Sequence, residues 1–562
     1  MLIKFFKIFC FVILLIYQSP VYSKNKDIQK FNSKILSSYF SALVSYDNQK
    51  NVDALKFFNL SNSLINRHDP YLKQYVFSLV MEGKIKRSIK QLKQSSGEKN
   101  SDFFEAYLIL MLDSIKKKDF KRSNRYLNEL SKFKRNGTFE LIIYESLKNY
   151  IYLFENKQTL SNNNTLGNLS LISKIFHSCY LGEKQTQTYF ENLVNSDEID
   201  YSRYIFFYIN YLIEQNQFNK AKEITDQIDI LNNSLLIAQT KNWIDKKEFE
   251  KFNQIFSCKN EIDILGEFFF LIANIYSSEN ELEKSNFYLN ISNFLNPKFR
   301  FNLSLLAENY YNSKNYRKSD KVLNNFNKND DVYYWYKTKK KTRIFSKESG
   351  EQQAYNFINS KFKQINKPSV KILFDMGNIA KGFKKHQVAI NYYDEVLPKI
   401  SVNSDTYAEI LFRRGGSYER LKNFKKSDAD LLKSLEISPN DAYVLNYLAY
   451  SWLERDYKID TAIEMLQRAY KQNENDPFII DSVGWGYYLV DDLVKAEQFL
   501  KRAIELMPND PIVNDHYGDI LWKMDRKIEA KYYWQSVLKS EDTEENMKEN
   551  IKIKLLKGLK KI

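Results

Sequence analysis

The chain has 562 residues, more than one hydrophobic core usually organises, so several domains or a long repeat array is expected. Only 15 Gly and 9 Pro are present, too few for an all-β or loop-rich protein. The net charge of +15 is uneven. Residues 438–540 hold 12 Lys/Arg against 17 Asp/Glu, a net of −5, which leaves +20 for the rest. The charge pattern describes a basic body and an acidic C-terminal module.

The N-terminus has the pattern of a secretory signal peptide. Lys4 and Lys7 precede an apolar run from Ile8 to Tyr17, and Val21 and Ser23 occupy the −3 and −1 positions of a cleavage site. The run is short for a membrane span, which needs about 20 apolar residues. We expect residues 1–23 to be removed and the protein to be exported to the periplasm. The alternative is an uncleaved segment that anchors the protein in the inner membrane.

Residues 24–400 show a weak helical periodicity with a step near 34 residues. Small and aromatic residues at this step fit units that begin near Ile35, Asp69, Phe104, Ser202, Gly266, Arg300, Trp335 and Val370. Residues 136–200 are the least regular. An enzymatic site hidden there is an alternative, but no nucleophile–base or metal-ligand pattern appears in that segment.

Two cysteines, Cys179 and Cys258, follow the predicted signal peptide. The repeat step places them more than two units apart, beyond the reach of a disulfide, so we expect two buried thiols. His68, His177 and His386 are scattered singly and suit packing or surface positions. These residues predict no metal site.

A segment with the sequence LPKISVNSDTY, residues 397–407, interrupts the step, and residues 401–540 then repeat clearly. Three triplets that begin with Asn-Asp recur at spacings of 35 and 34 residues: Asn440-Asp441-Ala442, Asn475-Asp476-Pro477 and Asn509-Asp510-Pro511. Ala449, Gly484 and Gly518 recur at the same spacings, and Ala462, Ala496 and Ala530 at 34.

This pattern resembles the tetratricopeptide repeat. A repeat that begins at Pro477 has Val483 and Gly484 at positions 7 and 8, an aromatic residue at 11, Ala496 at 20 and Ala503 at 27. Similar repeats begin at Ala408, Ala442 and Pro511. The resemblance implies an all-α fold, an α-solenoid in which antiparallel helix pairs stack into a right-handed superhelix. Residues 541–562 are amphipathic and basic, as in a C-terminal capping helix that faces solvent.

Catalytic motifs are absent from the sequence. There is no Gly-rich phosphate loop, H-E-x-x-H, paired-cysteine motif or G-x-S-x-G. Gly415-Gly416 in RRGGSYER lies in mid-helix, where packing explains Gly415. The lysine run 337–341 suits a solvated helix face. We expect no enzymatic activity, no cofactor and no nucleic-acid partner.

The sharpest functional hypothesis concerns one helix face in three successive repeats. Positions 2, 5, 9 and 12 point about 130° away from the packed face, toward the concave groove that this family usually forms. They hold Tyr443, Asn446, Tyr450 and Leu453 in one repeat, Phe478, Asp481, Trp485 and Tyr488 in the next, and Ile512, Asp515, Asp519 and Trp522 in the last. The proposed site residues are Asn446, Tyr450, Asp481, Trp485, Tyr488, Asp515, Asp519 and Trp522.

Rigid aromatics beside carboxylates are typical of a protein- or peptide-binding surface. We expect Trp485 to be displayed there, with Gly484 and Gly486 allowing close packing on either side. The carboxylates would repel a C-terminal carboxylate of the kind that tetratricopeptide co-chaperones grip. His516 beside Asp515 and Asp519 is expected to make a plain surface hydrogen bond to Asp519.

These features predict an exported scaffold that binds a protein partner in bacterial cell-envelope assembly or maintenance. The phrases LNYLAYSW, DSVGWGYY and NDHYGD are similar to the C-terminal module of exported bacterial tetratricopeptide proteins. The basic body could contact an envelope polymer or an anionic membrane surface. The alternative is a carbohydrate-associated scaffold for exopolysaccharide or peptidoglycan synthesis, because aromatic platforms also bind sugars.

Overall fold

The computed structural model describes residues 32–65, 68–95, 101–135, 138–160, 167–196, 200–229, 231–328, 330–540 and 543–559. Within these ranges the regular structure is helical, with no strand. The predicted all-α solenoid of stacked helix pairs is confirmed. The predicted signal peptide, residues 1–23, lies outside the described residues.

The described residues form two compact units. The first contains those up to Ile224 together with Asn242–Phe326, and the second contains Thr225–Lys241 together with those from Asn327 onward. A short segment from the middle of the chain therefore belongs with the C-terminal repeats. The predicted change of repeat quality at residue 400 falls inside the second unit.

The helices of the first unit begin close to the predicted repeat starts; for example, α2, α4, α6 and α11 begin within two residues of them. They are α2 (Ser33–Asp47), α3 (Asn51–Leu60), η1 (Asn62–Leu64), α4 (Asp69–Met81), α5 (Ile85–Gln94), α6 (Phe104–Lys116), α7 (Phe120–Leu130), η3 (Ser131–Phe133), α8 (Phe139–Asn156), α9 (Asn168–Leu181), α10 (Thr186–Val194), α11 (Ser202–Glu214), α14 (Glu250–Ile255), α15 (Glu261–Ser278), α16 (Leu282–Leu295), η4 (Arg300–Asn302), α17 (Leu303–Asn312) and α18 (Tyr316–Leu323). Two further helices, α12 (Phe218–Asp226) and α13 (Leu235–Asp245), each contain residues of both units.

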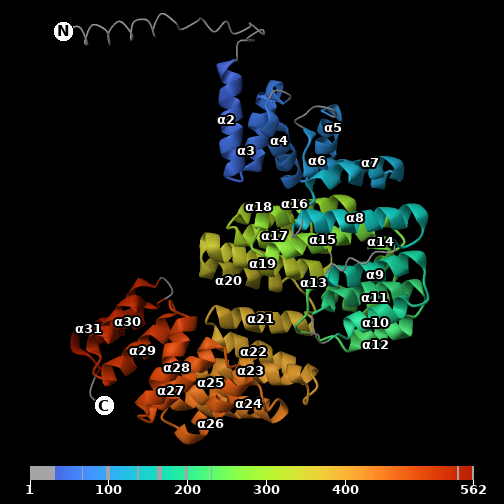
Figure 1. Cartoon of the computed structure of the whole chain (residues 1–562). Coiled ribbons are helices and arrows are strands. Elements are labelled where there is room, and N and C mark those ends of the chain that lie inside the picture. The colour runs from blue at the N-terminus through green and yellow to red at the C-terminus, as the bar shows by residue number, and fades with distance from the viewer. Residues whose placement is uncertain are drawn as a thin grey trace, which may run out of the picture. The chain divides into compact units, whose positions relative to one another are not determined.

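The second unit continues the pairs to the C-terminus. Its helices are α19 (Asp331–Ser349), α20 (Glu351–Phe362), α21 (Val370–Gly382), α22 (His386–Val396), η5 (Leu397–Lys399), α23 (Asp405–Arg420), α24 (Phe424–Ile437), α25 (Ala442–Leu453), α26 (Ile459–Gln472), α27 (Pro477–Leu489), α28 (Leu493–Leu506), α29 (Pro511–Lys523), α30 (Lys527–Lys539) and α31 (Glu545–Lys557). From α21 onward they follow one another in space in chain order (Figure 1).

The first unit is held together by contacts between helices that are far apart in sequence. Phe77 of α4 stacks on Phe287 of α16 with ring centroids 5.0 Å apart. In Figure 1, α8 lies beside α15, where Phe139 meets Tyr276 at 4.6 Å. This unit is therefore not a simple row of sequential neighbours.

A disulfide joins Cys179 at the end of α9 to Cys258 after α14, and both residues are buried. Their Cα atoms are 5.9 Å apart, within the range that a disulfide requires. The expectation of two separate thiols is wrong. It assumed that each repeat stacks only on the next, whereas the segment after α14 folds back onto α9, where Lys259 donates a hydrogen bond to the carbonyl of Tyr180 at 3.1 Å.

The second unit shows how the repeated Asn-Asp triplets work. Asp441, Asp476 and Asp510 are the N-caps of α25, α27 and α29, and each carboxylate accepts hydrogen bonds from two backbone N–H groups of the first turn. An N-cap Asp satisfies donors that the helix leaves unpaired and is typically worth about 1 kcal/mol. The triplets thus set the start of each first helix.

The two glycines around Trp485 have different packing environments. A Cβ atom on Gly484 would lie 2.6 Å from Leu500 Cγ, inside van der Waals contact with the partner helix α28. A Cβ on Gly486 would meet Leu453 and Leu466 of the preceding repeat at 3.4 Å. The expected close packing is confirmed at Gly484, whereas at Gly486 a methyl group would be in ordinary van der Waals contact, so that position does not require glycine.

Candidate partner-binding surface

The stripe is the set of side chains at positions 2, 5, 9 and 12 of α25, α27 and α29. Its scaffold is firm, since α25 packs on α27 and α27 on α29. Its outermost members are the apolar residues at position 2. Tyr443, Phe478 and Ile512 directly follow the first residue of their helices and are 58%, 55% and 50% exposed.

Trp485 lies at the centre of the stripe but does not display its ring faces. Its indole stacks on Tyr488 with centroids 4.7 Å apart and on His516 with centroids 4.1 Å apart. Rings at these two distances on one face of the indole would touch each other, and the described residues include no His516–Tyr488 ring contact. The two rings therefore cover opposite faces. The indole N–H donates to Glu454 at 3.1 Å.

His516 is buried and pairs with Asp481 across the repeat interface. Its Nδ1 atom lies 2.9 and 3.1 Å from the two carboxylate oxygens of Asp481. Burial lowers the pKa of His516, but the charge and hydrogen bond of Asp481, together with Asp515 and Asp519, raise the pKa above its ordinary value overall. The expected surface bond to Asp519 is wrong, because the imidazole turns toward the preceding repeat.

The acidic end of the stripe is bound by the protein's own C-terminal helix. Lys554 of α31 donates to Asp515 at 2.6 Å and to both oxygens of Asp519 at 2.7 and 2.8 Å. Asp519 also accepts from Trp534 at 3.0 Å. Burial, then the neighbouring Asp515, raises the pKa of Asp519 to about 6. These carboxylates are structural partners of α31.

Trp522 is likewise engaged by α31, since a Cβ atom on Gly558 at the end of that helix would overlap the indole. The helix therefore covers one end of the stripe with Ile551, Lys554 and Gly558, which are spaced three and four residues apart. That spacing in the tail was the one sequence signal for this contact.

The predicted site residues thus fall into two groups. Asp515, Asp519 and Trp522 contact α31, whereas Asp481, Trp485 and Tyr450 lie at or near His516. Tyr488 stacks on the other face of Trp485, and no hydrogen bond or ring contact among the described residues joins Asn446 to this group. Tyr450 lies 6.4 Å from the His516 ring, and burial followed by the charge of Glu454 raises its pKa. The buried carbonyl oxygen of Asn446 has no hydrogen-bond partner among the described residues.

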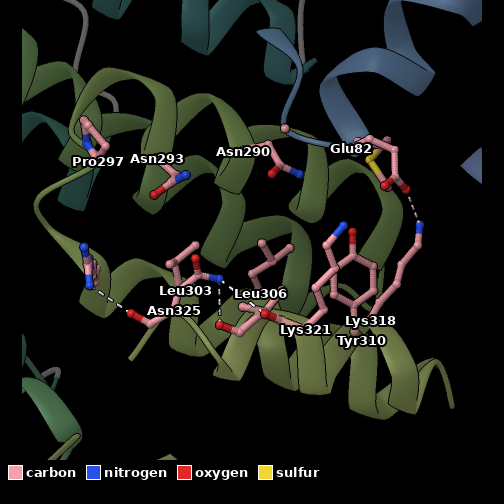
Figure 2. A pocket seen from close by; sticks show the side chains of 14 residues that line it. Glu82, Asn290, Asn293, Pro297, Leu303, Leu306, Tyr310, Lys318, Lys321 and Asn325 are labelled. Carbon is pink, nitrogen blue, oxygen red and sulfur yellow. Dashed lines mark hydrogen bonds and ion pairs between the residues drawn. The ribbon is translucent and has the colours of Figure 1, made fainter. Parts of the chain in front are cut away.

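The first unit contains a cavity of about 360 Å³ between α16, α17 and α18, closed by the end of α4 (Figure 2). Asn290 and Asn293 face it from α16, and Leu303, Leu306 and Tyr310 from α17. Lys318 and Glu82 form an ion pair at 2.9 Å at one end. The only carboxylate among its lining residues is thus neutralised, and the lining offers no nucleophile–base pair.

Two kinds of feature are missing from the described parts of the chain. Those residues include no cluster of three or more His, Cys, Asp and Glu that could hold a metal ion. Nor is any helix there long and apolar enough to cross a membrane.

Comparison with known proteins agrees with this architecture. The tetratricopeptide repeat family model matches residues 408–441, which span α23 and α24. This segment of the chain is similar to a tetratricopeptide repeat. A stretch of 91 residues is 32% identical to the TPR repeat-containing protein PA4667 of Pseudomonas aeruginosa and covers 16% of this chain and 15% of that protein. The chain thus matches only about a sixth of the length of this relative.

Solved structures are similar over about a third of the chain. TTC0263, a thermophilic tetratricopeptide protein of Thermus thermophilus, is 17% identical, with a TM-score of 0.30 over 34% of this chain and 100% of that one. The pilF protein of Pseudomonas aeruginosa is 17% identical, with a TM-score of 0.29 over 34% of this chain and 83% of that one. Tetratricopeptide proteins generally mediate protein interactions and are typically non-enzymatic scaffolds.

Proposed function

We propose that this protein is an exported, non-enzymatic scaffold whose C-terminal repeats bind a protein or peptide partner along the stripe. The observation that carries the proposal is the row of Tyr443, Phe478 and Ile512, three large apolar side chains at one position of three consecutive repeats, each half or more exposed. Aligned apolar side chains in water are typical of an interaction surface.

The partner segment suited to this surface is apolar and carries positive charge. The row would take its apolar side chains, and exposed Glu454, which already accepts from Trp485, would attract a lysine or arginine. Trp485, Tyr488 and His516 hold the surface rigid through ring stacking, which reduces the entropy lost on binding. Trp485, Tyr488 and His516 thus support the surface from below, while the row of Tyr443, Phe478 and Ile512 contacts the partner.

A photo-crosslinking experiment in cells tests the surface. A photoreactive amino acid replaces Phe478, and a matched one replaces Val494 of α28, which is 76% exposed and lies outside the stripe. We expect a specific protein adduct from position 478 that is absent from position 494. Changing Tyr443 and Ile512 to Ser in the same chain should reduce that adduct about tenfold, since central apolar contacts dominate binding. An unchanged adduct would exclude the stripe.

Export is part of the proposal, and the Cys179–Cys258 disulfide supports it because disulfides persist mainly in oxidising compartments such as the periplasm. Cell fractionation combined with mass spectrometry of the N-terminus separates a protein cleaved after Ser23 from one anchored in the inner membrane. A reduced pair of thiols in freshly quenched cells would contradict periplasmic residence.

A role in envelope assembly or maintenance follows from export and from the basic body, whose surplus of lysine would suit an anionic polymer or membrane surface. The carbohydrate alternative gains no support from the stripe. Sugar stacking requires an open aromatic face, and both faces of Trp485 are covered by Tyr488 and His516. Binding of the purified protein to isolated cell wall separates the protein-binding proposal from the carbohydrate alternative. If the stripe bound carbohydrate, the Phe478→Ser change would weaken binding to the cell wall.

A further inference from the structure

The cavity of the first unit lies between the second helices of two successive pairs. These are α16 of the pair α15–α16 and α18 of the pair α17–α18, and α17 lines the space between them (Figure 2). The wall along α16 runs from Asn290 past Asn293 to Pro297, which is about 10 Å for seven steps of a helix. The stripe, by contrast, is built from the first helices of their pairs. The cavity is therefore a separate site on another kind of helix face.

Positive charge dominates the lining of this cavity. Lys318 is paired with Glu82, the only carboxylate among the described lining residues. Arg300 donates to the backbone carbonyl of Asn325 at 3.0 Å. Neither Arg300 nor Lys321 has a carboxylate partner among the described residues, and both side chains are exposed. The cavity thus carries two uncompensated cations, which favour a ligand with negative charge.

Two buried polar side chains present free hydrogen-bonding atoms to the same space. Tyr310 is 7% exposed, and its hydroxyl has no hydrogen-bond partner among the described residues. Burial, followed by the charge of Glu82, raises the pKa of Tyr310, so the hydroxyl keeps its proton and can donate. Asn290 is 8% exposed, and its Nδ2 donates to the carbonyl of Asn286 at 2.9 Å, which leaves its Oδ1 to accept. Buried polar atoms are rarely left unpaired, so this donor and this acceptor suit a ligand that bonds both.

The remaining lining distinguishes between classes of anionic ligand. Leu303 and Leu306 of α17 give the cavity an apolar part, and both are buried. A phosphate ion would use the cations but leave these leucines uncovered, and a neutral sugar would offer nothing to the cations. A short acidic peptide has carboxylates, an apolar side chain, and backbone N–H and C=O groups for the acceptor and the donor. At about 3.3 Å per extended residue, a wall of about 10 Å holds about three residues.

We infer that this cavity binds an acidic peptide segment of about three residues. Arg300 and Lys321 pair with its carboxylates, while Asn290 and Tyr310 bond its backbone. The volume of about 360 Å³ lies at the lower end of the range for ligand pockets, in keeping with a short segment. The inference does not require the stripe to bind. The proposed partner of the stripe is positively charged, so the two sites would select segments of opposite charge.

Isothermal titration calorimetry of the chain from Lys24 onward tests the inference. The probe is acetyl-Glu-Leu-Glu-amide, and its neutral counterpart is acetyl-Gln-Leu-Gln-amide. We expect the acidic peptide to bind about tenfold more tightly than the neutral one. Arg300→Met and Lys321→Met together should reduce this preference to less than about twofold. Tyr310→Phe keeps the ring and removes only the hydroxyl, so it should weaken both peptides about fivefold.

The matched control is Lys314→Met together with Arg317→Met, two exposed cations near the start of α18 that do not line the cavity. It removes the same charge and should keep the tenfold preference. A preference that survives loss of Arg300 and Lys321, or that disappears equally in the control, would overturn the site. Equal binding of the two peptides, or no binding of either, would overturn it as well. Loss of binding on Phe478→Ser would place the peptide on the stripe instead of in the cavity.

Discussion

The two units reach stability by different routes. In the first, helices far apart in sequence pack together, and a disulfide and a buried ion pair join them. Arg203 of α11 makes a two-pronged ion pair with Glu267 of α15, with both N–O distances 2.7 Å. In the second, most packing is between successive helices, and similar interfaces recur from repeat to repeat.

This difference explains where the repeat pattern is visible. A sequential stack uses the same contact at every step, so a small residue is required at position 8 each time, as at Ala449, Gly484 and Gly518. Where a repeat also meets distant helices, its positions are shaped by individual partners and the pattern fades. Clear periodicity therefore reports local stacking, and weak periodicity reports long-range packing.

The largest expected effect is on the first unit. Arg203→Met would leave the Glu267 carboxylate, which is 2% exposed, without its partner and should cost about 3–5 kcal/mol of unfolding free energy. Hydrogen exchange should show lost protection in both α11 and α15, while α25–α30 keep theirs. Replacing both Arg203 and Glu267 by Met is the control and should recover most of the loss. Equal loss of protection in both units would contradict an effect confined to the first unit.

A smaller effect is expected at the repeat interface of the second unit. Gly484→Ala places a methyl group 2.6 Å from Leu500 and should cost about 2 kcal/mol through overpacking. Gly486→Ala has room at 3.4 Å and should be neutral or stabilising by up to about 1 kcal/mol, because alanine favours helix. Hydrogen exchange of α27 and α28, which measures their local unfolding, distinguishes the two variants. Equal destabilisation by Gly484→Ala and Gly486→Ala would contradict the tighter packing at Gly484.

The smallest expected effect depends on pH. Because the folded-state pKa of His516 is raised, its pairing with Asp481 stabilises fully below the unfolded pKa of about 6.5 and is lost as pH rises through the folded pKa. Asp519, with its pKa raised to about 6, titrates in the same sense. Asp481→Asn should flatten the decline in stability of α27–α30 between mildly acidic and mildly alkaline pH. If the stability of α27–α30 declined with pH as steeply in Asp481→Asn as in the wild type, the His516–Asp481 pair would not be the source of the pH dependence.

Much of the fold could be predicted because its signals are local. Asp441, Asp476 and Asp510 begin helices where expected, and Gly484 packs as expected. The Cys179–Cys258 disulfide could not be predicted, since it depends on the segment after α14 folding back onto α9.

The candidate site shows the same limit. Helix geometry gives the direction of Trp485 and Asp519, but it does not reveal what another helix lays over them. His516 covers one face of the indole, and Lys554 reaches Asp519 from 35 residues away. Both contacts come from neighbours that no position within the repeat specifies.

The attachment of α31 through Lys554 has a practical consequence for handling the protein. Removal of the last helix by a protease would leave Asp515 and Asp519 close together without their cation, so the final repeat would lose both a counter-ion and the cover over Trp522. Trimming at the C-terminus would therefore create a new acidic, aromatic surface. A C-terminal affinity tag should be joined by a flexible spacer after residue 562, so that α31 keeps its place.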